Sequence, residues 1–355
     1  MYIVLAILIF GILIAIHELG HFTAAKRLGV KVNEFAIGMG PKLFSRQRGE
    51  TLYALRLLPI GGACVMEGED EDNPDPRSFN AQKRWKRIVI LAAGSFANFV
   101  FGLLVVIILQ IGVQNVTGTT LAGFMPGFPG EGADGLMVGD TIHSINGERV
   151  RYYEDFALFM DLPAAEDGIV DLVIVRNGER IKLPNFDLTR REYTLENDIT
   201  VKRIGLYFQA LEPNFGTRLK YSFFTATNYV RLVRIGLVQM FSGQADFAEV
   251  AGPVGIVATI NESANDPRNE TVGARMETVF RIGAFIAMNL AVMNMLPIPA
   301  LDGGRIFGIA VTFIIEKITR RHVNPKYEGY IHAGGLVLLL ATMVIVMVSD
   351  IVKLF

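Results

Sequence analysis

The sequence predicts a polytopic α-helical membrane protein with four transmembrane helices and one extracytoplasmic α+β domain. Of the 355 residues, 51% are hydrophobic and only 19% are charged, whereas a soluble domain carries about 25% charged residues. The apolar residues also gather in four stretches, each long enough to cross a hydrocarbon core of about 20 helical residues. Between the second and third stretches the composition becomes that of a small soluble domain.

The charge balance and the cysteine content exclude several classes of protein. The chain has 34 Lys and Arg against 35 Asp and Glu, a net charge of −1, and no long run of like charge. This balance argues against a nucleic-acid partner. The single cysteine, Cys64, excludes an internal disulfide and a zinc site built from several thiolates. Any metal ligands must therefore be histidines and carboxylates.

The predicted spans cover residues 1–25, 88–111, 279–316 and 331–352. The first lacks a basic segment before its apolar stretch, so we expect it to stay in the mature protein rather than be removed as a signal peptide. The third is too long for one straight helix, because about 35 residues rise roughly 50 Å against a core of about 30 Å. A break is supplied by Pro297, Pro299, Gly303 and Gly304. Irregular backbone at membrane depth is tolerated only within protein or against a cavity, so the break indicates a functional site.

The distribution of positive charge predicts the orientation of the chain in the membrane. Twelve Lys and Arg residues lie between Lys26 and Arg87, and four lie between Lys317 and Lys326. Positive charge in short loops resists translocation, so both segments are expected on the cytoplasmic side. The two termini and residues 112–277 are then expected on the outer side, because a long translocated domain is largely exempt from the rule.

Residues 17–21 spell H-E-x-x-H in the second half of the first span. Histidines at i and i+4 share one helical face, so His17 and His21 can both bind one Zn²⁺ while Glu18 acts on a bound water. The alternative is a pair of core histidines without a metal. Ionisable groups in a spanning helix are costly and usually functional, which favours the zinc site. The other histidines, His143, His322 and His332, are interpreted as ordinary structural residues.

Asp302, in the broken part of the third span, is the candidate for the third zinc ligand. A catalytic zinc site takes three protein ligands and keeps one position for water. His17 precedes the basic residue Lys26 by nine positions, and Asp302 precedes Lys317 by fifteen. At helical rise both residues fall in the cytoplasmic half of the membrane. The alternative role for Asp302 is capping of the helix that follows.

The H-E-x-x-H motif, taken with N-x-x-P-x-P-x-L-D-G at 294–303, resembles the site-2 protease family of intramembrane zinc metalloproteases, peptidase M50. The closer resemblance is to its bacterial branch, which acts in regulated intramembrane proteolysis. Residues 35–41 and 59–62 resemble the membrane-associated β-hairpins of that branch, and 252–256 resembles the segment before its third span. The cytoplasmic loop 26–87 is therefore expected to contain membrane-associated β-hairpins.

The resemblance implies hydrolysis of peptide bonds within transmembrane segments of other proteins. One Zn²⁺ per chain would be held by His17, His21 and Asp302, and Glu18 would be the general base. Asn289 and Asn294 match family positions that hold substrate backbone; the alternative is hydrogen bonding between helices. The expected substrates are single-pass anti-sigma factors or signal-peptide remnants, and the expected location is the bacterial inner membrane, with lipid around the helices.

A substrate helix must unwind to expose its scissile bond, and an extended strand edge can then accept it by strand addition. The alternating stretch Leu52–Leu57 and the Gly-rich turn at 36–41 are the expected edge. The alternative is a hairpin that only packs beneath the helices. Gly61, Gly62 and Cys64 have no evident catalytic role, and the acidic run 67–72 is expected to be a solvated turn.

Residues 115–211 resemble a single bacterial PDZ domain, a partly open β-barrel, whereas the best-known Gram-negative members of the family carry two. A turn, a short helix and a strand ending in Asn-Gly are expected over 130–147, and a hairpin with the turn Asn177-Gly178 over 169–183. The domain could bind a substrate C-terminus, or an end left by an earlier cut, by strand addition. It could instead exclude bulky ectodomains from the active site. Residues 212–278 are expected to form an amphipathic helix and linker.

Three other interpretations fit the sequence less well than the resemblance does. A membrane zinc protease of the HtpX type shares H-E-x-x-H but uses a downstream glutamate as third ligand, and no later span offers one in place of Asp302. A catalytically inert scaffold would not need an intact set of His17, Glu18, His21 and Asp302. A transporter is disfavoured because no repeat relates the spans.

Overall fold

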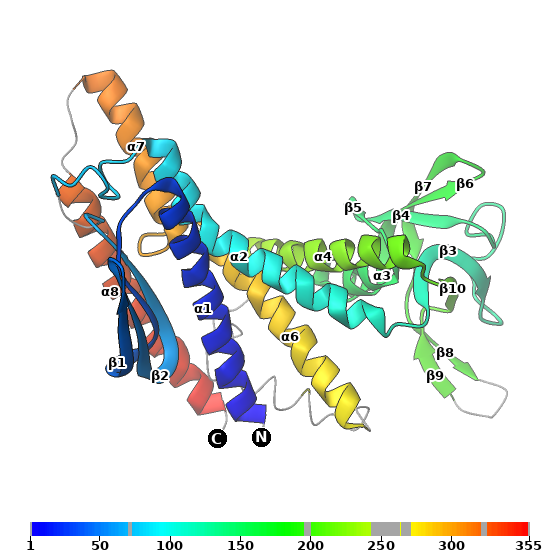
Figure 1. Ribbon diagram of the computed structural model, residues 1–355. Helices are drawn as coiled ribbons and strands as arrows, with labels where there is room; N and C mark the ends of the chain where they lie inside the picture. The colour runs from blue at the N-terminus through cyan, green and yellow to red at the C-terminus, as the bar shows by residue number, and fades with distance from the viewer. Residues whose placement is uncertain are drawn as a thin grey trace. The chain divides into compact units, whose positions relative to one another are not determined.

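Figure 1 shows a computed structural model of the chain, which describes residues 2–69, 73–194, 200–242, 271–320 and 325–353 together with Ser263. The chain divides into two compact units. The helical unit comprises Met1–Leu109 and Tyr229–Phe355, and the sheet unit comprises Gln110–Asn228.

Four helices of the described chain are long and apolar enough to cross a membrane, as the sequence predicts. They are α1 (Tyr2–Leu28), α2 (Arg84–Ile111), α6 (Val272–Met293) and α8 (Pro325–Lys353). Helix α6 begins at Val272 rather than at residue 279. Glu277 and Arg281 form an i,i+4 ion pair of 2.6 Å near the start of α6. The pair stabilises the helix over two charged residues that, by hydropathy alone, would not be placed in a membrane span.

The expected break in the third span separates α6 from α7 (Asp302–Thr319). A Cβ atom on Gly303 would lie 2.3 Å from the carbonyl oxygen of Leu296, and one on Gly304 would lie 2.1 Å from that of Ile298. The main-chain N–H of Gly303 also donates to the carbonyl of Asn294 at 2.7 Å. The first turn of α7 is therefore packed directly against residues 294–298, which follow α6, and this contact fixes the place of Asp302.

Strands β1 (Val32–Arg48) and β2 (Thr51–Met66) form one antiparallel hairpin that folds back on itself. Phe35, for example, pairs with both Tyr53 and Cys64. Gly38 and Gly61, at φ of 88° and 91°, adopt the left-handed backbone where the strands bend. The hairpin lies along α1 (Figure 1), and its segments follow the order 62–66, 32–37, 52–55, 44–48.

This folding-back changes which segment offers a free edge. Leu52–Leu55 pairs with 34–37 on one side and with 44–47 on the other, so the prediction that Leu52–Leu57 forms the free edge is wrong. Among the described residues, two segments pair on one side only: 62–66 pairs with 32–37, and 44–48 pairs with 51–55. Of the two, 62–66 is the edge that includes residues of the metal-centre cavity, Cys64 and Met66. The sequence pattern did not reveal this because the edge depends on the bends at Gly38 and Gly61.

Two apolar clusters hold the helical unit together. The first joins α1 to α6 through Ala6, Leu13, Val279, Ile286 and Ala287. The second joins α1, the hairpin, α2 and α7 through Ala25, Val30, Val32, Met66, Phe79, Ile90, Leu91 and Ile309. Helices α1 and α2 cross closely at Gly20, where a Cβ would lie 2.3 Å from the carbonyl oxygen of Ala93.

The sheet unit contains an antiparallel sheet in the order β10-β3-β4-β6-β7, with β5 beside β4. Its strands are β3 (Val116–Phe124), β4 (Thr141–Ile145), β5 (Glu148–Arg149), β6 (Ile169–Arg176), β7 (Glu179–Asp187) and β10 (Leu206–Leu211). Strands β8 (Arg191–Thr194) and β9 (Thr200–Arg203) form a separate hairpin. The helices are α3 (Tyr153–Met160), the 3-10 turn η1 (Pro163–Ala165) and the first half of α4 (Phe215–Phe241).

The hairpin predicted over 169–183 is present, with Asn177 and Gly178 at φ of 51° and 86° in the turn. The short helix expected before β4 is absent from 130–140, which forms turns instead. Arg176 donates to the carbonyl oxygens of Ala133 at 3.0 Å and Gly135 at 2.6 Å. These carbonyls therefore accept hydrogen bonds from a side chain and not from the main-chain N–H groups of a helix. In the expected linker, α4 covers Phe215–Phe241, whereas the family-like segment 252–256 lies outside the described residues.

Candidate metal centre

Three donor atoms converge between α1 and the start of α7. His17 and His21 lie one turn apart on α1, and Asp302 is the first residue of α7. The Nε2 atoms of the two histidines lie 3.1 Å apart. Oδ2 of Asp302 lies 3.2 Å from His17 Nε2 and 3.3 Å from His21 Nε2. Among the residues that the structure describes, these three form the one group of histidine, cysteine and acidic side chains close enough to share a metal ion.

The donor set fits Zn²⁺. Ligand atoms about 2.0–2.1 Å from a tetrahedral zinc lie roughly 3.3 Å from one another, which matches the three separations. The carbonyl oxygen of Ile90 lies 2.8 Å from Nδ1 of His21, so that nitrogen carries the proton and Nε2 offers a lone pair. Oδ2 of Asp302 is buried without a hydrogen-bond partner. Electron-rich atoms held this close together are stabilised by a cation bound between them.

The surroundings leave the histidines little freedom. A Cβ atom on Gly94 of α2 would lie 2.4 Å from His21 Nε2 and 2.7 Å from Cε1 of His17. The side-chain amide nitrogen of Asn294, Nδ2, lies 3.4 Å from Nδ1 of His17. Such outer contacts fix the tautomer and the orientation of a metal-binding imidazole.

The centre opens into a cavity of about 280 Å³. Glu18 lines this cavity together with Asn294 and the three candidate ligands; the remaining lining residues are Cys64, Met66, Glu69, Leu91, Ala300, Leu301 and Arg305. Gly62 on β2 leaves the room that the Glu18 side chain occupies, because a Cβ there would lie 2.9 Å from Glu18 Cγ. A carboxylate therefore stands beside the three donor atoms in a polar, partly enclosed space.

The predicted site residues do not all meet here. Asn289 is half-buried on α6 and is not among the described residues that line the cavity. Of the histidines interpreted as structural, His143 lies on β4 and His332 on α8, whereas His322 is outside the described residues.

Sequence reasoning missed five residues at the site: Gly62, Cys64, Glu69, Gly94 and Arg305. Residues 67–69 form a partly exposed turn, as expected for 67–72, but the sequence did not reveal that its carboxylates are paired: Glu67 accepts a 2.7 Å hydrogen bond from Lys31, and Glu69 pairs with Arg305. The sequence does contain one signal for Arg305: it lies three positions after Asp302, and residues at that spacing share a helical face. The other contacts depend on how α2 and β2 pack against α1.

Comparison with known proteins agrees with this geometry. The model of Peptidase family M50 matches residues 5–342. A protein of Clostridium perfringens named as a zinc metalloprotease is 36% identical over 99% of this chain and 99% of its own length. The Regulator of sigma-W protease RasP of Bacillus subtilis is 27% identical, and the Zinc metalloprotease RasP of Geobacillus kaustophilus is 28% identical, each over 98% of this chain and at least 97% of the relative. The chain therefore belongs to peptidase family M50 and is a membrane-embedded zinc metalloprotease.

Proposed function

We propose that this protein hydrolyses peptide bonds within the transmembrane segments of other membrane proteins, with His17, His21 and Asp302 as the zinc ligands. The observation that carries the proposal is the convergence of their three donor atoms within 3.1–3.3 Å of one another. They meet in a cavity beside Glu18, in a unit whose helices are long and apolar enough to cross a membrane. Charged groups at such a position are costly and are retained for function.

Glu18 is the general base of the proposed reaction. When bound, Zn²⁺ polarises the scissile carbonyl and lowers the pKa of the attacking water. Glu18 takes a proton from that water as its oxygen attacks the carbonyl carbon, and passes the proton to the amide nitrogen as the C–N bond breaks. The products are a new carboxyl group and a new amine, and the proton that the acid then loses at neutral pH leaves the amine as an ammonium group. Asn294 keeps His17 oriented through its 3.4 Å contact with Nδ1.

The edge formed by Gly62–Met66 is the proposed docking strand for the substrate. A transmembrane helix hides its carbonyls in its own hydrogen bonds, so it must unwind before it is cut. An unwound segment replaces those bonds by pairing with a free strand edge. Residues 62–66 pair on one side only among the described residues, and Cys64 and Met66 line the cavity. Asn294, which lines the cavity, and Asn289, one turn before the end of α6 and outside the cavity lining, are proposed to contact substrate backbone.

The proposed substrates are single-pass anti-sigma factors or signal-peptide remnants. The name of the Bacillus subtilis relative refers to regulation of sigma-W, which supports the first class. The proposed location is the bacterial inner membrane. Basic loops at 26–87 and 317–326 support an active site in the cytoplasmic half, with both termini and the sheet unit outside the cytoplasm.

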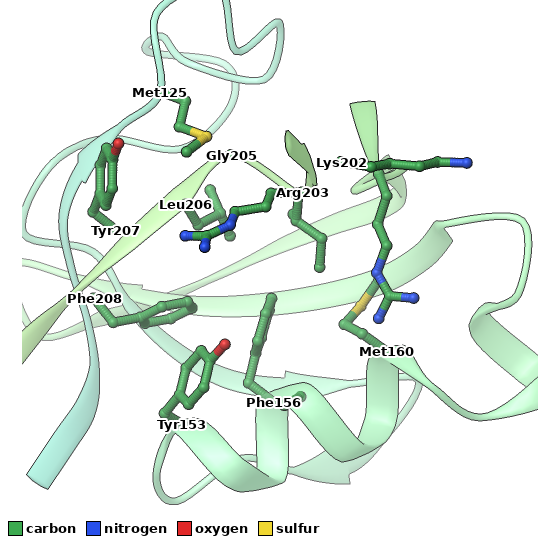
Figure 2. A pocket seen from close by; sticks show the side chains of 13 residues that line it. Met125, Tyr153, Phe156, Met160, Lys202, Arg203, Gly205, Leu206, Tyr207 and Phe208 are labelled. Carbon is green, nitrogen blue, oxygen red and sulfur yellow. The ribbon is translucent and has the colours of Figure 1, made fainter. Parts of the chain in front are cut away.

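The sheet unit is proposed to be a PDZ domain that binds an extended C-terminus, either of an intact substrate or of one already cut. Strand β10 is at the edge of the sheet, and a pocket of about 410 Å³ lies beside it. Figure 2 shows Tyr153 and Phe156 of α3 and Phe208 of β10 among the residues that line this pocket, with both α3 rings packed against Phe208. Lys202 and Arg203 also line it, and their positive charge suits a terminal carboxylate.

Fluorescent peptides of one sequence, with a free or an amidated C-terminus, test this assignment on the full-length protein. Tighter binding of the free carboxylate, weakened by Arg203→Glu, supports a ligand-binding domain. Equal binding of the two peptides contradicts it. A cleavage rate that instead falls as the substrate ectodomain grows, and recovers when residues 115–211 are deleted, supports size exclusion.

The proposed activity is tested by incubating the detergent-purified protein with a model single-pass helix and locating the cut by mass spectrometry. We expect cleavage within the apolar segment, loss of cleavage with a zinc chelator and recovery with Zn²⁺. A cut confined to the flanking soluble residues would contradict an intramembrane protease.

A further inference from the structure

Arg305 and Glu69 form an ion pair across the cavity of the metal centre. The guanidinium of Arg305, on α7 three residues after Asp302, donates to the Glu69 carboxylate in the turn after β2. The two side chains are 26% and 18% exposed and are separated by 236 residues of sequence. Arg305 is the one cation among the described residues that line this cavity. The pair is therefore a long-range contact inside the site rather than a surface ion pair.

The turn that carries Glu69 is held firmly to its surroundings. The N–H of Glu67 donates to the Lys31 carbonyl at 2.9 Å, and the N–H of Phe79 donates to the Glu67 carbonyl at 2.8 Å. The side-chain amide of Asn80 donates to the carbonyl of Glu69 at 3.1 Å. Because β2 ends at Met66, this turn is the direct continuation of the Gly62–Met66 edge.

The helix that carries Arg305 is equally constrained. Gly303 and Gly304 pack against the turn that ends α6, and the Gly303 N–H bonds the Asn294 carbonyl at 2.7 Å. The ion pair thus joins two anchored elements: the free strand edge on one side of the cavity and the helix that carries Asp302 on the other. A pair that is less than one-third exposed is screened less than a surface pair, so removal of either partner costs more than it would at the surface.

We propose that Arg305 and Glu69 are positioning residues for substrate. Their ion pair holds the Gly62–Met66 edge at a fixed distance from the metal centre, so that a segment added to the edge presents its scissile bond to the metal. The pair acts on substrate presentation and not on metal binding. This inference rests on the proposed function, because it concerns the strand that the substrate would join.

The test compares full-length Glu69→Gln, Arg305→Gln and Arg305→Lys with the exchanged double variant Glu69→Arg/Arg305→Glu. The matched control is Arg84→Gln, which removes the ion pair of Arg84 with Glu316 between α2 and α7, away from the cavity lining. Three quantities are measured: zinc per chain, kcat and KM for a model helix, and the rate at which a small maleimide alkylates Cys64. Cys64 is the only cysteine of the chain and lines the cavity, so its alkylation reports whether the edge has moved.

Arg305→Gln and Glu69→Gln should each keep the zinc and raise KM by about fivefold or more, with a smaller change in kcat. Alkylation of Cys64 should be several-fold faster in both. Arg305→Lys and the exchanged variant should recover part of both losses, and Arg84→Gln should behave as wild type.

Alkylation also responds to charge, so the two single variants are compared with each other. Burial raises the pKa of the Cys64 thiol, and the negative charge of Glu69 raises it further. Removal of Glu69 therefore speeds alkylation by itself, whereas removal of the Arg305 cation favours the unreactive thiol. Faster alkylation in Arg305→Gln therefore reflects greater access to Cys64 and not a change in charge, and Arg305→Lys, which keeps a long side chain in the cavity, separates movement of the edge from the room left by a shorter side chain.

Unchanged KM and unchanged alkylation in Arg305→Gln would overturn the proposal. So would loss of zinc from Arg305→Lys, or an exchanged variant whose defects equal the sum of those in the single variants. If the wild type cleaves no helix, the proposed function fails, and the alkylation rates still decide whether the pair holds the edge.

Discussion

Gly94 of α2 lies directly against His21 of α1, because a Cβ atom on the glycine would stand 2.4 Å from the imidazole Nε2. The proposed zinc ligand thus owes its position to the absence of a side chain on the neighbouring helix. Gly94→Ala should displace the imidazole and weaken zinc binding about 10- to 100-fold, as loss of outer support does in other zinc sites. Zinc content after dialysis against a graded series of chelator concentrations measures the change.

Gly102→Ala is the control for this prediction, since it lies two turns further along α2 and meets Met288 and Ala287 rather than a histidine. It should retain zinc as the wild type does. Equal zinc affinity in Gly94→Ala and wild type would show that the close contact has no role in the metal centre.

Asp302→Asn should lose both zinc and cleavage. The amide keeps the shape of the carboxylate but removes its negative charge. In the wild type, the buried Oδ2 atom of this carboxylate lies 3.2 and 3.3 Å from the two histidines. We expect zinc affinity to fall by at least about tenfold. Glu316→Gln, on the same helix but outside the cavity lining, should keep the metal. A full complement of zinc with normal activity in Asp302→Asn would rule out its role as third ligand.

Gly62→Ala should separate catalysis from metal binding. The added methyl group would stand 2.9 Å from Cγ of Glu18 and push the proposed base out of place, while the three metal-binding atoms are untouched. Zinc should stay near one per chain and kcat should fall about 10²-fold or more, the usual contribution of a general base. Gly118→Ala on β3, whose nearest neighbour would be 3.5 Å away, should change neither. Normal kcat in Gly62→Ala would contradict the proposal that Gly62 leaves the room that the Glu18 side chain needs.

The sequence predicts the membrane spans, the break before Asp302 and the candidate ligands, because these depend on local pattern. Apolar length marks a span, and the i,i+4 spacing places His17 and His21 on one helical face. Proline and glycine mark the break. The turn Asn177-Gly178 was equally predictable, since two residues with positive φ select a hairpin.

The remainder depends on contacts between distant segments. The free edge of the hairpin could not be placed without knowing that Phe35 pairs with both Tyr53 and Cys64. Gly94 is one of many glycines until α2 is packed against the histidines. The chain from 130 to 140 departs from a helix because Arg176 binds its carbonyls from another strand, and no local pattern reveals that contact.

The stability of the sheet unit should depend on the ion pair between Asp140 and Arg176. The Asp140 side chain is only 1% exposed and accepts hydrogen bonds from Arg176 Nε at 2.8 Å and from the Met137 N–H at 2.7 Å. Burial alone would raise the pKa of Asp140, but the guanidinium and this N–H hold the pKa below its ordinary value. The stabilisation is therefore complete above pH ~4 and is lost as the pH falls through the lowered pKa.

Arg176→Gln leaves the buried carboxylate without its cation and should destabilise the sheet unit by about 3–5 kcal/mol at pH 7. Burial then raises the pKa of Asp140, so part of this loss should be recovered as the pH is lowered. Hydrogen exchange of β4 and β6 in the full-length protein measures both effects, with the exposed Arg180→Gln on β7 as control. Exchange protection equal to wild type at pH 7 would contradict this role for the pair.

The central claim is that His17, His21 and Asp302 hold a zinc ion on which Glu18 acts. The most direct measurement is zinc per chain in detergent-purified wild type and Glu18→Gln, paired with cleavage of a model single-pass helix by both. We expect about one zinc in each protein and cleavage by the wild type alone, because the substitution removes the base and leaves the ligands. Cleavage by Glu18→Gln at the wild-type rate, or a zinc-free wild type that still cleaves, would contradict the account.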